Sequence, residues 1–340
     1  MRLEIQYLRA IAVASVVIFH YFPTLAPGGF VGVDIFFVIS GYLITTHLLK
    51  EITSGKISLA AFWARRARRI IPAALLTILV TFFAGLFIAP NLSDLYSYAS
   101  HALASTLFYE NWQLIFQNLG YGSATADVSP FQQFWSLGIE EQFYLFWPLL
   151  LALTLFIFKG DNRKFQAVGF VIAGILVVSF SYSLFITNQD SATAYLSTPA
   201  RVWQLAFGGL VAYFMNRFKL LFFETRYFRA LGWATLLIGI LFIREEGFPG
   251  LAALVPVLGT ALVILAGHRQ SSGKLFTTSM VPVLFIGTIS FSIYLWHWPM
   301  LVLIQHLRNH DVGGSWKLLL LMAVLFVSWF SEKFVERPMR

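Results

Sequence analysis

Residues 7–24, YLRAIAVASVVIFHYFPT, form an apolar stretch that is interrupted by Arg9 and His20. A helix rises about 1.5 Å per residue, so a stretch of this length can cross the roughly 30 Å hydrocarbon core of a bilayer. An ionisable side chain within such a span is energetically expensive and usually has a function. The stretch therefore predicts a transmembrane helix, and Arg9 and His20 are the first candidates for functional residues.

The composition of the whole chain indicates a membrane protein. Of its 340 residues, 58% are hydrophobic and 12% are charged, whereas soluble domains contain about 25% charged residues. Most of the surface is therefore expected to face lipid. The chain has no cysteine, which excludes disulfides, thiolate metal ligands and a cysteine nucleophile.

Ten hydrophobic segments are long enough to cross a membrane, and they predict an all-α, polytopic membrane helix bundle that forms a single domain over residues 1–340. The predicted spans are 7–24, 31–49, 70–89, 134–157, 166–187, 200–216, 229–243, 249–267, 281–304 and 316–332. Segment 95–117 is also apolar, but it carries His101, Glu110 and Asn111, and Asp94 directly precedes it.

The distribution of basic residues supports this topology. If the ten spans alternate from a cytoplasmic N-terminus, all but four of the 24 Lys and Arg residues lie on the cytoplasmic side; the exceptions are Arg201, Arg244, Arg308 and Lys317. Such a bias is what the positive-inside rule predicts, and it places both termini in the cytoplasm. A spanning 95–117 would destroy the asymmetry, so we expect an interfacial or re-entrant helix outside. The basic excess thus reflects topology and not nucleic-acid binding.

Polar residues within the predicted spans form an outer layer that contains His20. Arg9 and His20 are eleven positions apart, which separates them by about 16 Å along one helix face. His20 falls toward the outer side, as do Asp34, Glu140, Glu141, Arg201 and His297. An imidazole can accept a proton near neutral pH, and we expect Asp34 to hold its tautomer. The outer layer therefore predicts a general-base site.

An inner layer is purely basic. It consists of Arg9 and of a cluster directly before the third span, Arg65, Arg66, Arg68 and Arg69. Guanidinium groups stay ionised and can bind two oxygens at once, so this layer suits the phosphates of a donor molecule.

Structural explanations remain open for each of these signals. The arginine cluster can be a topogenic charge run or a patch for anionic lipid, and Arg9 can extend to the interface. His20 can be a hydrogen-bonded packing residue, and Glu140 and Glu141 can stabilise a helix N-terminus. His297 lies between two tryptophans, as in an aromatic belt.

Six motifs follow one another along the chain: Arg9 and His20 with ten residues between them, Gly32-Val-Asp34-Ile-Phe-Phe-Val-Ile-Ser40-Gly41-Tyr42, Arg65-Arg66-Ala-Arg68-Arg69-Ile-Ile-Pro72, Phe134-Trp-Ser-Leu-Gly-Ile-Glu140-Glu141-Gln142-Phe-Tyr144, Ser292-Ile-Tyr294-Leu-Trp-His297 and Phe334-Val-Glu336-Arg-Pro338. In this order they resemble the signature of the acyltransferase-3 family of integral membrane acyltransferases. Each motif is weak alone, but six at family-like positions are a specific signal.

The resemblance implies transfer of an acyl group, usually acetyl, from cytoplasmic acyl-CoA to a hydroxyl of an extracytoplasmic glycan. Lipopolysaccharide O-antigen, exopolysaccharide and peptidoglycan are such acceptors, and the bacterial inner membrane is the implied location. His20 is then the catalytic histidine, segment 32–42 lines the site, and Arg9, Arg65, Arg66, Arg68 and Arg69 bind acyl-CoA. We expect Ser40, Glu140, Glu141, Tyr144, Arg201, His297 and Glu336 to serve the acceptor side or to support the site.

We expect His20 to abstract the proton of the acceptor hydroxyl while Asp34 orients the imidazole, and the acceptor then attacks the thioester directly. An acyl-histidine intermediate is the alternative.

Acyl-CoA is a substrate, and we expect no permanently bound cofactor and no metal. Many relatives append an extracytoplasmic SGNH domain, whereas the given sequence ends at Arg340. We therefore expect a self-sufficient transferase, a transferase that needs a separate SGNH-type protein as partner, or a chain that is cut at the domain boundary. Other readings are acylation of a small molecule and, in another class, a proton-coupled transporter.

Overall fold

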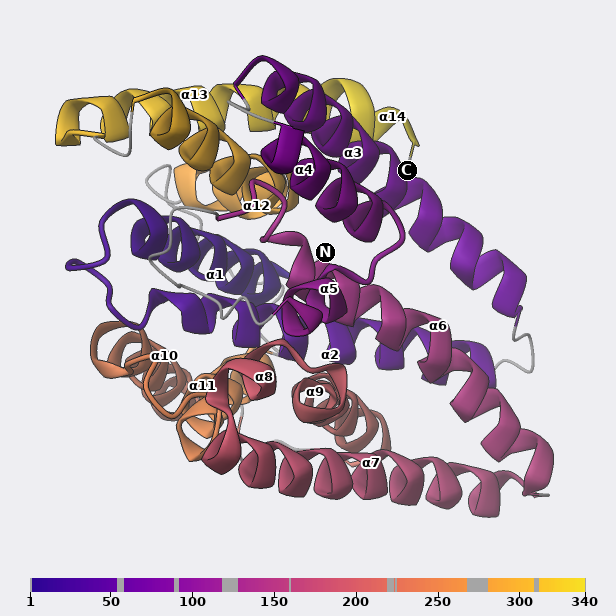
Figure 1. Cartoon of the computed structure of the whole chain (residues 1–340). Helices are drawn as coiled ribbons and strands as arrows, with labels where there is room; N and C mark the ends of the chain where they lie inside the picture. The colour runs from indigo at the N-terminus through magenta and orange to yellow at the C-terminus, as the bar shows by residue number, and fades with distance from the viewer. Residues whose placement is uncertain are drawn as a thin grey trace. The chain divides into compact units, whose positions relative to one another are not determined.

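The computed structural model of the chain describes residues 2–53, 58–88, 92–117, 128–158, 160–218, 223, 225–267, 281–308 and 312–339. Every regular element within these ranges is helical (Figure 1). The all-α class predicted from the sequence is confirmed. 

Each predicted span coincides with a helix. These helices are α1 (Leu3–Tyr21), α2 (Gly32–Thr53), α3 (Leu59–Ile88), α6 (Phe134–Ile157), α7 (Asp161–Gln189), α9 (Thr198–Arg217), α10 (Arg226–Phe242), α11 (Leu254–Ala266), α12 (Val281–Leu307) and α13 (Gly314–Ser331). Among the described residues, seven helices are long and apolar enough to cross a membrane, and α9, α10 and α11 are not among them. The number of ten spans and the cytoplasmic termini therefore stay predictions.

Contacts between Cα atoms divide the chain into two compact units, each made of two chain segments. Unit 1 comprises residues 1–59 and 142–288, and unit 2 comprises residues 60–141 and 289–340. The divisions fall inside α6 and inside α12, so these two helices contribute residues to both units.

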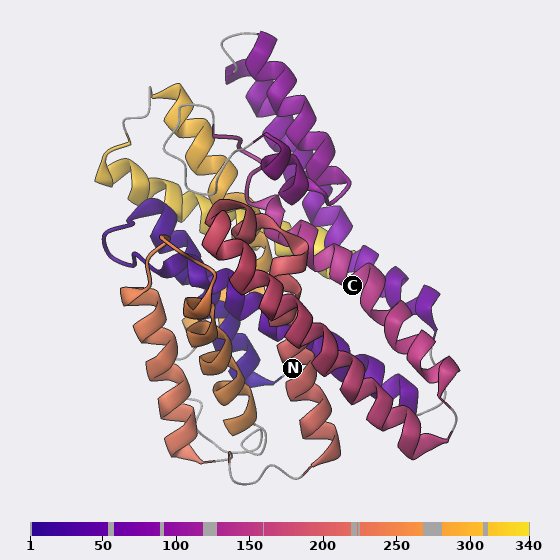
Figure 2. The same cartoon turned by 60° about the horizontal axis from the view of Figure 1, so that its bottom comes forward.

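Unit 1 is organised around α2. This helix packs against α1, α9 and α11, while α7 packs on α9 and α10 packs on α11. Figure 2 shows α10 and α11, in orange, running side by side. The remaining elements of the unit are the short helix α8 (Ser191–Leu196) and two 3-10 turns, η1 (Gly29–Val31) and η3 (Leu251–Ala253).

The crossing of α2 and α9 depends on glycine. A Cβ on Gly41 would overlap the carbonyl oxygen of Leu205, and a Cβ on Gly208 would overlap that of Val38. Small residues at a helix crossing let the two backbones approach closely, which is a common way to pack membrane helices. This approach places the N-terminal half of α2 directly against α9.

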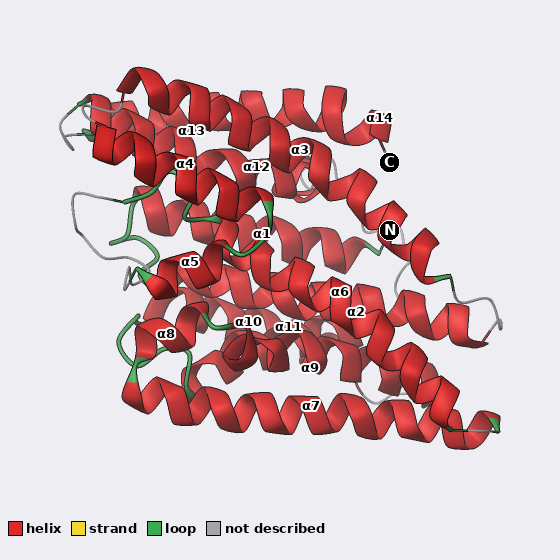
Figure 3. Ribbon diagram, turned by 45° about the vertical axis from the view of Figure 1, so that its right-hand side comes forward, coloured by secondary structure: helices red, strands yellow, loops and turns green. Residues whose placement is uncertain are grey.

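Unit 2 contains α3, the first turns of α6, most of α12 and α13. It also holds α4 (Leu92–Thr106), α5 (Glu110–Phe116), the π-helical turn η5 (Glu332–Glu336) and α14 (Arg337–Met339). Segment 95–117 is thus two short helices, which Figure 3 shows as separate red ribbons, and the chain breaks between them at Phe108 with φ 56°. As predicted, the segment does not form one spanning helix; its interfacial location stays a prediction.

The α2–α9 crossing generates a stability prediction. Gly41→Ala places a methyl group on the Leu205 carbonyl, so the helices must move apart, and we expect a loss of about 1–3 kcal/mol in the free energy of unfolding. The matched control is Gly174→Ala in α7, where a Cβ meets nothing within 4 Å. Thermal unfolding in detergent measures both; an equal Tm for the two variants would contradict the role of the crossing.

Candidate functional site

Helix α1 carries both residues with which the sequence argument begins. It runs without interruption from Leu3 to Tyr21, so Arg9 and His20 keep a separation of about 16 Å along its axis. Arg9 is only 7% exposed, which means that protein encloses its guanidinium. The ring of His20 is half-buried and packs at 5.3 Å, between centroids, against Phe19.

The next helix of the site, α2, carries a fully buried carboxylate. Oδ1 of Asp34 accepts a hydrogen bond from Nη1 of Arg201 at 3.2 Å and another from Nε2 of Gln204. Asp34, Arg201 and Gln204 are all 0% exposed. The two partners are three positions apart in α9 and therefore share a helix face. This face meets Asp34 because of the close α2–α9 crossing.

Aromatic rings surround the guanidinium of Arg201. Its Cζ lies 5.0 Å from the ring centroid of Tyr195 in α8, 5.4 Å from that of Phe248 and 5.7 Å from that of Phe37 in α2. A cation at these distances is attracted by the faces of the rings. Arg201 is therefore held by a carboxylate and by rings from three parts of unit 1.

The pairing of Asp34 with Arg201 changes the expected role of Asp34. Its Oδ2 has no hydrogen-bond partner among the described residues, and its described hydrogen bonds run to α9. The expected pairing of Asp34 with His20 stays a prediction. Depth in the membrane placed His20 and Arg201 in the same predicted layer as Asp34, and only His20 was expected to pair with Asp34. 

Sequence reasoning missed Gln204 altogether. A signal for it exists, because Gln204 follows the flagged Arg201 by three positions in an otherwise apolar run. A polar residue at this spacing from a buried cation is expected on the same face.

The other site residues that were predicted in unit 1 lie on α2 and α6. Ser40 is half-buried on α2, and Tyr144 is 2% exposed in α6 beside Phe143. Arg2, which the motifs do not include, donates to the hydroxyl of Tyr42 at 2.6 Å and to the carbonyl of Ile264 at 2.7 Å. Arg2 thus joins the start of α1 to α2 and α11.

In unit 2 the four clustered arginines are of two kinds. All of them lie in the first turns of α3, which begins at Leu59. Arg65 and Arg68 are exposed, whereas Arg66 and Arg69 are half-buried and lie close enough to Glu141 of α6 for a favourable electrostatic interaction. Two guanidinium groups of the cluster therefore neutralise a carboxylate, and the other two face outward.

This arrangement joins residues that the sequence argument assigned to different layers, while the depth of each in a membrane stays a prediction. The sequence placed Glu141 in the outer layer and the arginines in the inner one, yet Glu141 lies within electrostatic range of Arg66 and Arg69. The reason is that α3 is a 30-residue helix, so the arginines belong to the helix that packs in unit 2 and not to a loop ahead of it. Glu141, in turn, lies two turns inside α6.

A polar network joins the first turns of α6 to α12 within unit 2. The hydroxyls of Ser136 and Tyr294 are 2.6 Å apart, and Tyr294 donates to the carbonyl of Gln133 at 3.0 Å. Glu140 lies within electrostatic range of Tyr294. Nδ1 of His297, a fully buried residue, donates to the Tyr294 carbonyl at 2.7 Å. Two of the predicted supporting residues, Glu140 and His297, therefore meet the same tyrosine.

The last two sequence motifs also meet in unit 2. Oγ of Ser292 in α12 donates to Oε1 of Glu336 in η5, and both residues are buried. Glu336 thus fixes the C-terminal turn to α12. Arg9 and His20 belong to unit 1, whereas the arginines of α3 belong to unit 2, so a common donor site for Arg9 and the cluster stays a prediction.

A polytopic helical membrane protein with buried carboxylates, an imidazole and guanidinium groups on its helices is the class that this fold and these residues define. The chain belongs to the acyltransferase-3 family, because the model of that family, described as an acyltransferase domain, matches residues 2–331. It is 34% identical to the peptidoglycan O-acetyltransferase OatA of Listeria monocytogenes serovar 1/2a, over 99% of this chain and 55% of the relative.

A second relative is the O-acetyltransferase OatA of Staphylococcus aureus, which is 32% identical over 98% of this chain and 56% of the relative. The chain therefore spans a little more than half the length of the curated relatives that it matches. No solved structure matches the chain.

The buried pair of Asp34 and Arg201 generates a stability prediction. Asp34→Asn leaves the guanidinium without its counter-charge, and breaking one side of a buried ion pair costs about 3–5 kcal/mol. We expect a lower Tm and a lower yield of folded protein for this variant and for Arg201→Gln.

The double variant Asp34→Asn/Arg201→Gln provides the control. Because it removes both charges together, it should lose less stability than the sum of the two single variants. Strict additivity in thermal unfolding would show that the two side chains do not stabilise each other.

Proposed function

We propose that this chain is a membrane O-acyltransferase that moves an acetyl group from cytoplasmic acetyl-CoA to a hydroxyl of an extracytoplasmic glycan. Peptidoglycan is the acceptor that the name of the Listeria relative indicates. The proposed location is a bacterial cell membrane, with both termini in the cytoplasm. The proposed partners are acyl-CoA, the glycan and membrane lipid.

The observation that carries the proposal is the pair of polar residues on α1. Arg9 is enclosed by protein and His20 is half-buried, on one helix face and about 16 Å apart. A phosphate-bearing donor that is held at the arginine can extend its reactive end toward the imidazole. Family membership supports the same direction of chemistry.

His20 is the proposed catalytic residue. As a general base, it takes the proton of the acceptor hydroxyl while the hydroxyl oxygen attacks the thioester carbonyl, and the thiol of CoA leaves. As a nucleophile, it takes the acyl group first and passes it to the acceptor. Asp34 is assigned a positioning role, because its hydrogen bonds to Arg201 and Gln204 fix the start of α2.

The four arginines of the cluster are proposed to have two different roles, donor binding and structural support. Arg65 and Arg68 are exposed, and arginine binds phosphate oxygens in a bidentate manner, so these two are proposed to contact the phosphates of the donor. Arg66 and Arg69 interact with Glu141 and are proposed to position α3 against α6. The cluster thereby combines a donor site with its own structural support.

This division predicts different phenotypes for two pairs of substitutions. Arg65→Gln/Arg68→Gln should weaken acetyl-CoA binding at least tenfold without a change in Tm. Arg66→Gln/Arg69→Gln should lower Tm, because Glu141 loses its neutralising charges. Isothermal titration with acetyl-CoA measures donor binding, and thermal unfolding measures stability. Equal changes in acetyl-CoA affinity and in Tm for the two double variants would contradict the assignment of different roles to the two pairs.

The proposed function is tested with purified protein in lipid nanodiscs, by measuring the transfer of labelled acetyl from acetyl-CoA to soluble peptidoglycan fragments. We expect His20→Ala to abolish transfer while acetyl-CoA still binds, and Arg9→Ala to weaken that binding. His47→Ala is the matched control, since His47 is largely exposed and pairs with Glu51. Absence of both binding and transfer in the wild type would refute the proposal and favour a transporter.

A further inference from the structure

Unit 1 contains a groove that the proposed chemistry does not use. It lies between α9 and α11, has a volume of about 310 Å³ and is partly open. Each helix contributes residues at positions i, i+3, i+4 and i+7, which form a stripe along one helix face. The lining residues are Phe207, Leu210, Val211, Phe214, Phe223, Leu258, Ala261, Leu262 and Leu265.

The lining of this groove does not suit a polar ligand. All nine lining residues are apolar, so a ligand with hydrogen-bonding groups would lose its hydrogen bonds to water there without replacement. Pockets for polar small molecules contain a few polar groups that orient the ligand. The groove therefore suits a hydrocarbon chain, which needs no hydrogen-bond partner.

The groove is accessible along its length. All lining residues except Val211 and Ala261 are half-buried or exposed, and Phe214 and Leu258 are 41% and 44% exposed. The stripe on each helix extends over seven positions, or roughly 10 Å. This length fits within the hydrocarbon depth of one leaflet, which is about 15 Å. One acyl chain from one leaflet can therefore lie along the groove.

Arginines follow the lining at one end of the groove. Phe214 is the last lining residue of α9, and Arg217 comes three positions later on the same face. Arg226 begins α10 only three residues after Phe223, and Arg229 follows one turn later. Figure 2 shows the last turns of α9 and α11 and the first turn of α10 toward the bottom of the view. The apolar groove therefore ends beside cationic side chains.

Aromatic contacts hold this end of the groove in place. Cζ of Arg217 lies 6.0 Å from the ring centroid of Phe165 in α7, at which distance the ring face attracts the cation. The ring of Phe223 packs at 5.1 Å, between centroids, against Phe228 of α10. Arg217 and Arg226 are both exposed. A headgroup at this end can therefore meet two guanidinium groups.

The charge of the connection between α9 and α10 favours an anion. Segment 217–229 has four basic residues and one acidic residue: Arg217, Lys219, Arg226, Arg229 and Glu224. The predicted topology places this segment on the cytoplasmic side, where the leaflet carries anionic lipid. Guanidinium groups bind phosphate oxygens in a bidentate manner. Charge complementarity therefore favours an anionic headgroup over a zwitterionic one.

We propose that the groove between α9 and α11 binds one anionic phospholipid. Its acyl chain lies along the apolar lining, and its phosphate contacts Arg217 and Arg226. The headgroup selects the lipid by charge, and the groove fixes the position of the chain. The proposal is independent of the proposed acyl transfer, because it concerns lipid binding alone.

Native mass spectrometry of the purified full chain in detergent tests the proposal. The probes are phosphatidylglycerol and phosphatidylcholine with identical acyl chains, and inorganic phosphate is the competitor. We expect one phosphatidylglycerol per chain, bound about tenfold more tightly than phosphatidylcholine. Inorganic phosphate at the same concentration as the lipid should leave this binding unchanged, because it has no chain to fill the groove.

Two variants separate the headgroup from the chain. Arg217→Gln/Arg226→Gln should weaken phosphatidylglycerol binding about tenfold and leave phosphatidylcholine binding unchanged, because only the charges are lost. Leu258→Trp puts a larger side chain into the groove, so it should weaken the binding of both lipids.

The matched controls involve α10. Arg244→Gln removes an exposed arginine that follows the C-terminal end of this helix. Leu237→Trp enlarges a leucine that is 56% exposed and is not among the described lining residues. We expect wild-type affinity for both lipids in both controls. If Leu258→Trp does not fold, Leu262→Phe decides the test by the same measurements.

Several outcomes would overturn the proposal. Absence of bound phosphatidylglycerol, or equal affinities for the two lipids, would show that no anionic headgroup is recognised. Wild-type affinity in Leu258→Trp would place the lipid outside the groove, and competition by inorganic phosphate would indicate a site for a free anion. A dimer mass without bound lipid would show that a second copy covers the groove. Failure of the proposed function differs from all of these, since it appears as absence of acetyl transfer.

Discussion

The buried ion pair between Asp34 and Arg201 is the constraint on which the organisation of unit 1 depends. Two charges that are 0% exposed are tolerated only when they are paired and hydrogen-bonded. That requirement fixes the face and the depth at which α2 meets α9. The crossing must in turn be close, and glycines at positions 41 and 208 allow it. Segment 32–42 is therefore held by electrostatics at one end and by backbone packing at the other.

Hydropathy predicted where helices lie, because each apolar run must satisfy its backbone within itself in lipid. The distribution of basic residues, and not hydropathy, predicted that 95–117 is not one span. Hydropathy could not predict which polar side chains pair. It placed His20, Asp34 and Arg201 at one depth, whereas the pairing of Asp34 with Arg201 depends on helix rotation and on the α2–α9 crossing. Gln204 was missed for the same reason, and the interaction of Glu141 with Arg66 and Arg69 was not predicted because α3 begins before its arginines.

A run of like charges can conceal two structural classes. The pattern Arg65-Arg66-Ala-Arg68-Arg69 reads as one basic patch in the sequence. On a helix, positions three and four apart are neighbours, so position 65 adjoins both 68 and 69, and periodicity alone does not divide the run into two faces. The structure divides it, because Arg66 and Arg69 are half-buried and within electrostatic range of Glu141, whereas Arg65 and Arg68 are exposed. The position of Glu141, and not the sequence pattern, thus distinguishes the two pairs.

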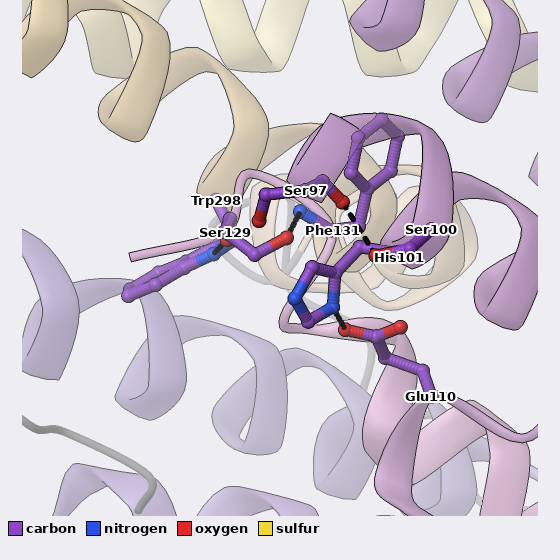
Figure 4. Close-up of polar contacts among 7 residues, drawn as sticks. All are labelled: Ser97, Ser100, His101, Glu110, Ser129, Phe131 and Trp298. Carbon is purple, nitrogen blue, oxygen red and sulfur yellow. Dashed lines mark hydrogen bonds and ion pairs between the residues drawn. The ribbon is translucent and has the colours of Figure 1, made fainter. Parts of the chain in front are cut away.

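The same reasoning applies to the buried carboxylates of Asp34 and Glu110. A carboxylate that accepts a hydrogen bond from an imidazole fixes the tautomer of the ring. Asp34 has its described hydrogen bonds to Arg201 and Gln204, whereas Oε1 of Glu110 lies 2.6 Å from Nδ1 of His101 (Figure 4). The two buried carboxylates therefore differ in their partners because helix packing, and not residue type, decides which side chains meet.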